Sequence, residues 1–291
     1  MHKSAFINII GNPNVGKSTL MNRIMGEKFS IISSKAQTTR HRIMGMLNSE
    51  DYQLVFSDTP GILQPKYKLH ESMMKFVQDA LVDADVLILV TDIFETPESF
   101  SEVLKKIESM QAPVLLLINK VDLVKDNEKL TALINQWKEH LPKADVMIIS
   151  ALEGFNTEHI LKKILDFAKE GPAYFPKDEI SDKPMRFFVS EIIREKIFVT
   201  YKKEVPYACE VVVEEYNEEE DIVRIHANII VERESQKPIL IGKGGVKLKY
   251  IGIDARKDLE KFIGKQVYLR MFVKVDKDWR TDDSKLRKYG Y

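Results

Sequence analysis

The chain has 291 residues, of which 44% are hydrophobic and 30% are charged, a composition typical of a globular protein long enough for two domains. No apolar stretch approaches the roughly 20 residues that span a bilayer, which excludes an integral membrane protein. The only cysteine, Cys209, excludes an intrachain disulfide and favours a cytoplasmic location. Basic and acidic residues number 44 each, but residues 237–274 hold ten Lys or Arg against three acids, so a local basic patch is expected.

Up to about residue 170, short apolar runs alternate with amphipathic segments. The runs are rich in Val, Ile and Leu, which is typical of strands buried on both faces of a parallel sheet. They cover residues 5–10, 52–57, 85–92, 113–119 and 145–150. Between them, residues 99–110 and 127–141 have helical spacing. The sequence therefore predicts an α/β P-loop domain over residues 1–170, with a mostly parallel sheet and helices on both faces.

The first apolar run leads into GNPNVGKS, residues 11–18, and a helix-like segment follows. This matches the phosphate-binding pattern G-x-x-x-x-G-K-[ST] in the strand–loop–helix context that the pattern requires. Backbone N–H groups at the helix start would bind the phosphates. Lys17 would reach the β- and γ-phosphates, and Ser18 would bind Mg²⁺. The residues assigned to this site are Gly11, Asn12, Pro13, Asn14, Val15, Gly16, Lys17, Ser18 and Thr19.

The motif DTPG, residues 58–61, closes the second apolar run. Asp58 would hold Mg²⁺ through a water molecule, and the backbone N–H of Gly61 would detect the γ-phosphate, so that its loss frees the following loop. A threonine from the preceding segment would complete the Mg²⁺ ligands, and we favour Thr39 over Thr38. The nucleotide contacts assigned here are Asp58, Thr59, Pro60, Gly61 and Ile62, and the catalytic group is Lys17, Thr39, Asp58 and Gly61.

The choice between adenine and guanine depends on NKVD, residues 119–122. The Asp122 carboxylate can accept hydrogen bonds from N1–H and the 2-amino group of guanine, whereas adenine offers no donor there. The motif SAL at the end of the last apolar run would close over the base. The base contacts assigned are Asn119, Lys120, Val121, Asp122, Ser150, Ala151 and Leu152.

Residues 171–184 contain three prolines and no periodicity, so we interpret them as a linker. Residues 185–291 then predict a small α+β domain with a basic C-terminal tail, because helical segments at 185–201 and 245–263 alternate with strand-like segments at 207–216, 222–232 and 266–275. The loop GKGG between two helix-like segments matches the G-x-x-G loop of a KH domain, which binds RNA through close approach of the phosphates to the backbone. The RNA contacts assigned are Ile241, Gly242, Lys243, Gly244, Gly245, Lys247, Lys249, Arg256 and Lys257.

The four nucleotide motifs, in this order and spacing, resemble those of translation-factor-related GTPases. With the GKGG loop in a basic second domain, nearly the whole chain is similar to the Era-like family of bacterial GTPases with a type II KH domain. The resemblance implies a GTP-dependent protein that uses GTP, GDP and Mg²⁺, binds the 3′ end of 16S ribosomal RNA and assists assembly of the small (30S) ribosomal subunit. It also implies a peripheral association with the membrane. We expect a monomer.

Two further expectations come from the resemblance. Ile62 stands where Ras-like GTPases have the Gln that orients the attacking water, so slow intrinsic hydrolysis is expected. Asn14 resembles the asparagine that helps to hold K⁺ beside the phosphates in potassium-activated relatives; the alternative is that it merely suits the turn. A second hypothesis for the whole chain is an RNA-binding module in which hydrolysis is vestigial. An active switch is favoured by the intact residues Lys17, Ser18, Asp58 and Asp122.

Several side chains have simpler interpretations. Cys209 and Trp137 are expected in the core. Ile239, Ile241, Leu248 and Ile251 are expected in the core of the second domain, with the alternative that some of them line a groove under unstacked bases. Trp279 lies near the basic segment KLRKYGY, where a contact with RNA or a partner is the alternative to packing.

Overall fold

The computed structural model describes residues 2–32, 35 and 37–291. The chain divides into two units. The first consists of Met1–Ser30, Thr39–Leu63 and Met74–Asp182, and the second of Ile31–Thr38, Gln64–Met73 and Lys183–Tyr291. Two short segments from the N-terminal half of the sequence therefore belong to the C-terminal unit. Among the described residues, no helix is both long and apolar enough to cross a membrane.

The strands of the first unit are β1 (Lys3–Ile10), β2 (Ile43–Asn48), β3 (Tyr52–Asp58), β4 (Val86–Asp92), β5 (Val114–Asn119), β6 (Asp145–Ile148) and β7 (Lys169–Glu170). In the described part of the chain they form one sheet in the order β2-β3-β1-β4-β5-β6, and β7 also pairs with β1. The five predicted strands are β1 and β3 to β6, and they pair in parallel. The predicted α/β fold with a mostly parallel sheet is confirmed.

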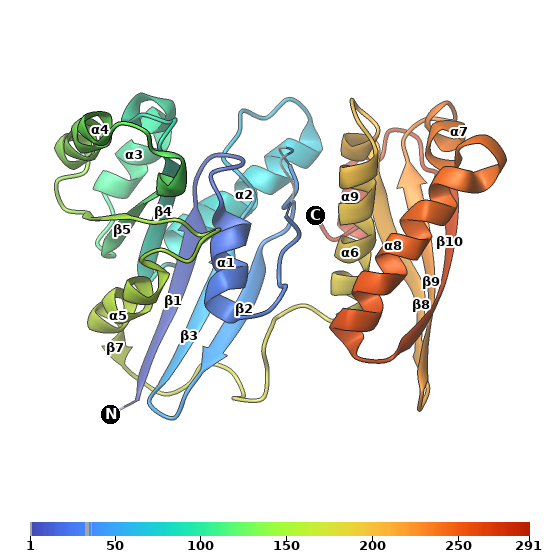
Figure 1. Cartoon of the computed structure of the whole chain (residues 1–291), viewed down its shortest axis with the longest axis horizontal. Coiled ribbons are helices and arrows are strands. Elements are labelled where there is room, and N and C mark those ends of the chain that lie inside the picture. The colour runs from blue at the N-terminus through green and yellow to red at the C-terminus, as the bar shows by residue number, and fades with distance from the viewer. Residues whose placement is uncertain (1, 33–34, 36) are drawn as a thin grey trace. The chain divides into compact units, whose positions relative to one another are not determined.

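The helices of this part of the chain are α1 (Lys17–Met25), α2 (Lys68–Val82), η1 (Pro97–Phe100), α3 (Ser101–Glu108), η2 (Val121–Leu123), α4 (Asn127–His140) and α5 (Thr157–Phe167). They cover both faces of the sheet (Figure 1): α2, α3 and α4 pack on one face around Trp137, and α1 and α5 lie on the other. Because the strands are parallel, the loops after β1, β3 and β5 meet at one edge of the sheet, where open α/β sheets bind their ligands.

The strand β2 was not predicted. It pairs antiparallel with β3 at the edge of the sheet, and residues 179–182 hydrogen-bond to it on its other side. Met46 donates its backbone N–H to the Ile180 carbonyl at 3.0 Å, and Ser181 forms a bridge with Gly45. These residues of the expected linker therefore have defined contacts in the first unit.

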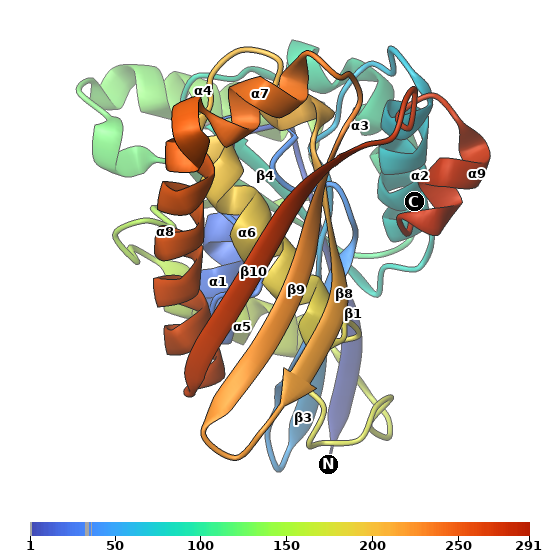
Figure 2. The same ribbon diagram turned by 90° about the vertical axis from the view of Figure 1, so that its right-hand side faces the viewer.

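The second unit contains α6 (Met185–Thr200), η3 (Pro206–Ala208), β8 (Glu210–Glu218), β9 (Ile222–Val231), α7 (Gln236–Ile241), η4 (Lys243–Gly245), α8 (Val246–Ile263), β10 (Gln266–Val275) and α9 (Asp283–Lys288). Its sheet has the order β10-β9-β8, with β9 parallel to β10 and antiparallel to β8. Figure 2 shows α6 and α8 packed along this sheet. The α+β order matches the prediction.

The core of the second unit corrects one prediction and decides between two alternatives for Trp279. Ile239 was predicted in the core but is 47% exposed, and the neighbouring Leu240 is buried instead. Successive residues of a helix point about 100° apart, so the prediction placed the buried face of α7 one residue too early. Trp279 is fully buried and donates its indole N–H to the Ala208 carbonyl at 3.1 Å. It is a packing residue and not an exposed RNA contact. Trp137 and Cys209 are buried as predicted.

Candidate nucleotide and RNA sites

The phosphate-binding loop lies between β1 and α1. The buried ammonium group of Lys17 donates to the carbonyl oxygens of Gly11 at 3.0 Å and Asn12 at 2.8 Å, which folds the loop around its own lysine. Gly16 precedes α1 with φ +103°, and a Cβ there would lie 2.2 Å from Nδ2 of Asn119. Glycine is therefore required at this position, both for the backbone angle and for the approach of the base-binding motif.

The charge of Lys17 is sensitive to its surroundings. Burial lowers the pKa of Lys17 to about 8, although the negative charges of Asp58 and Glu95 oppose this effect. Triphosphate oxygens placed at this ammonium group would favour its protonated form. Burial thus disfavours the protonated form of Lys17, and a bound anion would stabilise that form.

Glu95 is a residue near the phosphate loop that the motifs did not reveal. Its carboxylate accepts from Asn12 Nδ2 at 2.9 Å and from Thr91 Oγ1 at 3.3 Å. Burial raises the pKa of Glu95 above its ordinary value. The only signal in the sequence is its position three residues after the end of β4, which places it at the same sheet edge as the other motifs.

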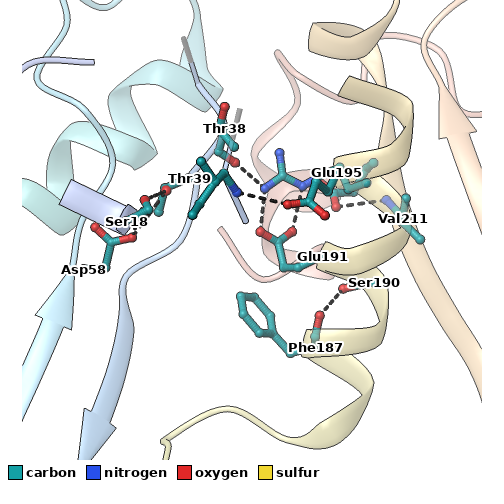
Figure 3. A network of polar contacts seen from close by, with 12 residues as sticks. Ser18, Thr38, Thr39, Asp58, Phe187, Ser190, Glu191, Glu195 and Val211 are labelled. Carbon is teal, nitrogen blue, oxygen red and sulfur yellow. Dashed lines mark hydrogen bonds and ion pairs between the residues drawn. The ribbon is translucent and has the colours of Figure 1, made fainter. Parts of the chain in front are cut away.

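Three oxygen-bearing side chains meet beside the phosphate loop (Figure 3). Ser18 Oγ donates to Asp58 Oδ2 at 2.7 Å and lies 2.9 Å from Thr39 Oγ1, which itself lies 3.4 Å from Asp58 Oδ2. Thr38 does not join this cluster, because its hydroxyl donates to the Lys35 carbonyl at 2.6 Å. Burial raises the pKa of Asp58, although Lys17 and the hydrogen bonds of the carboxylate oppose the shift.

This cluster fits a hard divalent cation. Hydroxyl and carboxylate oxygens are ligands that Mg²⁺ prefers, and Asp58 Oδ1 is buried with no hydrogen-bond partner among the described atoms. Buried polar oxygens are rarely left unsatisfied in the functional form of a protein. No group of three or more His, Cys, Asp or Glu side chains suited to another metal occurs in the described part of the chain.

The DTPG motif lies directly against the phosphate loop. Thr59 Oγ1 donates to the Ile9 carbonyl at 2.7 Å, and the Ile62 N–H donates to the Gly11 carbonyl at 3.0 Å. A Cβ on Gly61 would meet the backbone and ring of Pro13 at 2.8 Å. The backbone that would detect the γ-phosphate therefore touches the loop that would bind it.

The base-binding motifs are joined by a network around Asn119. Asn119 donates through Nδ2 to the Val15 carbonyl at 2.7 Å and accepts through Oδ1 from the Ala151 N–H at 2.9 Å. Asp122 accepts from Ser150 Oγ at 2.6 Å. The structure thus brings NKVD and SAL together with the phosphate loop. Leu152 is 70% exposed at the rim of this region.

The GKGG loop connects α7 to α8 in the second unit. Gly244 and Gly245 have φ +62° and +77°, and a Cβ on either would meet no atom within 4 Å. The backbone conformation of the loop therefore favours glycine over residues with side chains. The space in front of the two glycines is open. Four exposed basic side chains lie on α8: Lys247, Lys249, Arg256 and Lys257. This combination suits a phosphate chain that approaches the backbone closely.

Comparisons with known proteins identify both domains. Residues 6–120 match the family described as 50S ribosome-binding GTPase, and residues 204–280 match the KH domain family. Together, the two matched families define a GTPase whose nucleotide-binding domain is followed by a KH domain.

The full-length relatives are more specific. The GTPase Era of Staphylococcus epidermidis is 44% identical over 292 residues, which cover 100% of this chain and 97% of the relative. The GTPase Era of Staphylococcus haemolyticus is 45% identical with the same coverage. The chain belongs to the Era family of GTPases.

Two solved structures share the whole fold. A crystal structure of Era in complex with MgGDPNP and nucleotides 1506–1542 of 16S ribosomal RNA has a TM-score of 0.94 and 39% identity, and the match covers 100% of this chain and 99% of the other. A variant of Aquifex aeolicus Era bound to GDP and AlF4⁻ also has a TM-score of 0.94 and 39% identity, with 99% of each chain covered.

Proposed function

We propose that this GTPase is a molecular switch that binds the 3′ end of 16S ribosomal RNA and assists assembly of the 30S subunit. The observation that carries the proposal is the open, positive-φ GKGG loop in the same chain as a nucleotide site with every guanine-specific motif. The full-length likeness to an Era structure that holds a 16S fragment supports the choice of RNA. The protein is proposed to act in the cytoplasm as a monomer.

The nucleotide site is proposed to hold GTP or GDP with Mg²⁺. Ser18 and Thr39 would bind the metal, and Asp58 would hold it through water. Bound there, Mg²⁺ neutralises charge on the phosphates. Lys17 would contact the β- and γ-phosphates, and Asp122 would bind guanine. The peripheral membrane association implied by the resemblance stays a prediction.

The RNA site can be tested by replacing Lys243 and Gly244 together with Asp. The affinity for a short single-stranded RNA with the 16S 3′-end sequence should fall at least about 100-fold, because two carboxylates and added bulk occupy the place of a phosphate. The slope of log affinity against log salt should also become shallower. GTP binding and hydrolysis in the absence of RNA should change little.

The other end of α8 supplies a control. Gly264, like Gly244, has positive φ, and a Cβ added there would meet no atom within 4 Å. The exposed Lys261 lies one turn before it. Replacing Lys261 and Gly264 with Asp makes the same change in charge and backbone preference away from the loop. Equal losses of RNA affinity in the two double variants would reject GKGG as the RNA site.

Potassium is expected to accelerate GTP hydrolysis relative to sodium by about tenfold or more, because a cation held by Asn14 would stabilise charge that develops at the phosphates. Asn14→Ala should abolish the difference between the salts. Rates are compared at one ionic strength, with Asn12→Ala as a control because Asn12 is the other asparagine of the same loop. A parent protein that hydrolyses GTP equally fast in both salts would refute a cation role for Asn14.

A further inference from the structure

The carboxylate of Glu95 is held in a fixed direction just after β4. Its Oε2 accepts from the hydroxyl of the buried Thr91 at 3.3 Å. The turn between these residues is closed by Asp92, whose backbone carbonyl accepts the Glu95 N–H at 3.2 Å and whose carboxylate accepts the Phe94 N–H at 2.9 Å. Contacts with the last residues of β4 therefore orient the Glu95 side chain.

The other oxygen of this carboxylate binds a side chain of the phosphate loop. Glu95 Oε1 accepts from Nδ2 of Asn12 at 2.9 Å. An ionised carboxylate has no hydrogen to donate, so the amide nitrogen of Asn12 must face it. The phosphate-binding pattern leaves position 12 unspecified, yet here the side chain at this position joins the loop to the residues that follow β4.

The backbone of the same asparagine holds the lysine of the loop. Lys17 Nζ donates to the carbonyl oxygens of Asn12 at 2.8 Å and Gly11 at 3.0 Å. A lysine ammonium group has three N–H donors, so two bonds to fixed carbonyls also set the direction of the third. The position of Asn12 thus determines where Lys17 can meet an approaching phosphate.

Stability of the fold does not by itself explain a glutamate at this place. Burial raises the pKa of Glu95, although the hydrogen bonds from Asn12 and Thr91 oppose the shift, so the folded chain disfavours the charged carboxylate. That charge would also repel the phosphates of a nucleotide. Both effects are unfavourable, and the contact that distinguishes Glu95 is its hydrogen bond with the phosphate loop.

We propose that Glu95 is a positioning residue for phosphate binding: it holds Asn12 so that the phosphate loop and Lys17 keep the geometry that binds a nucleotide. The inference rests on the proposed contact of Lys17 with the β- and γ-phosphates. Every residue that it uses lies in the first unit. Its consequence is that Glu95, without touching the nucleotide, lengthens the time for which a nucleotide stays bound.

The test compares two replacements of Glu95 in the full chain. The readout is the dissociation rate of a fluorescent GDP analogue at one Mg²⁺ concentration. Glu95→Leu removes the acceptor and should raise the rate about tenfold, the effect of losing one hydrogen bond to a charged group. Glu95→Gln keeps an oxygen that can accept from Asn12, and its rate should stay within about threefold of the parent, because a neutral acceptor forms a weaker but similar bond.

Two further variants make the result specific. Asn12→Ala should accelerate release as much as Glu95→Leu, and the two changes together should accelerate it no further, because both remove one hydrogen bond. Glu98→Leu is the matched control. Glu98 lies three residues after Glu95 and accepts from Gln136 Nε2 at 3.1 Å, away from the phosphate loop, so its replacement should leave the dissociation rate unchanged.

The possible outcomes separate the inference from the proposal beneath it. If Glu95→Leu is folded and releases the analogue at the parent rate, the positioning role is rejected. Equally fast release from Glu95→Gln and Glu95→Leu would also reject it, because Gln can still bind Asn12. Should Glu95→Leu fail to fold, an unchanged rate in Asn12→Ala has the same meaning. Undiminished nucleotide affinity in Lys17→Met would instead show that the proposed phosphate contact is itself wrong.

Discussion

GTP binding is expected to weaken by a few kcal/mol when Asp122 is replaced by Asn, and the protein should then prefer xanthosine nucleotides. Two hydrogen bonds between the carboxylate and guanine are lost, each contributing about 1.5–3 kcal/mol. The Asn side-chain amide can donate to the carbonyl that xanthine has in place of the 2-amino group. The measurement is a pair of titrations with GTP and xanthosine triphosphate on parent and variant.

The hydrogen bond between Asp122 and Ser150 can be kept in this variant. Its Oδ1 accepts from Ser150 Oγ, and an Asn oxygen can accept the same bond. Asp126→Asn is a matched control, because Asp126 caps α4 through the N–H groups of Glu128 and Lys129 and Asn caps helices equally well. If Asp122→Asn leaves GTP affinity at the parent value and gains nothing with xanthosine triphosphate, NKVD does not bind the base.

The second large effect concerns the stability of the first unit. Gly16→Ala should lower the free energy of unfolding by about 2–5 kcal/mol, the sum of about 1–2 for a left-handed backbone and about 1–3 for overpacking. The overpacking arises because the new methyl would lie 2.2 Å from Asn119 Nδ2. Asn119 cannot move away without breaking its bonds to Val15 and Ala151.

Gly26→Ala separates the two contributions to this loss. Gly26 ends α1 with φ +73°, but a Cβ there meets no atom within 4 Å, so its replacement includes backbone strain and no clash. Denaturant unfolding of the nucleotide-free chain, followed by circular dichroism, should show the larger loss for Gly16→Ala. Equal losses would mean that the Asn119 side chain adapts to the methyl without measurable cost.

The sequence predicted the parts of the fold that local patterns specify. The central strands are continuous apolar runs, and the motifs at their carboxyl ends could be placed at one sheet edge because parallel strands share that edge. β2 was missed because IMGMLN is short and contains Gly45. Its position depends on pairing with β3, which a local pattern does not encode.

Glu95, beside the phosphate loop, could not be predicted in the same way. It belongs to no motif, and its hydrogen bond with Asn12 joins residues 83 positions apart in the sequence. In the second unit, Arg194 lies in REKIF and reads as an ordinary charged residue on a helix, yet its side chain is 1% exposed. One of its contacts is the Thr38 carbonyl, 156 positions away in the sequence, which a local pattern does not reveal.

The assignment of Gln64–Met73 to the second unit has a consequence for the order of events during synthesis. Leu69 donates its backbone N–H to the Arg280 carbonyl at 3.0 Å, and the Arg280 guanidinium lies over the Tyr67 ring at 4.9 Å. A nascent chain leaves the ribosome from its N-terminus, so more than 200 residues must be added before these contacts can form. The segment that follows DTPG therefore acquires these native neighbours only after the chain has been synthesised beyond residue 280.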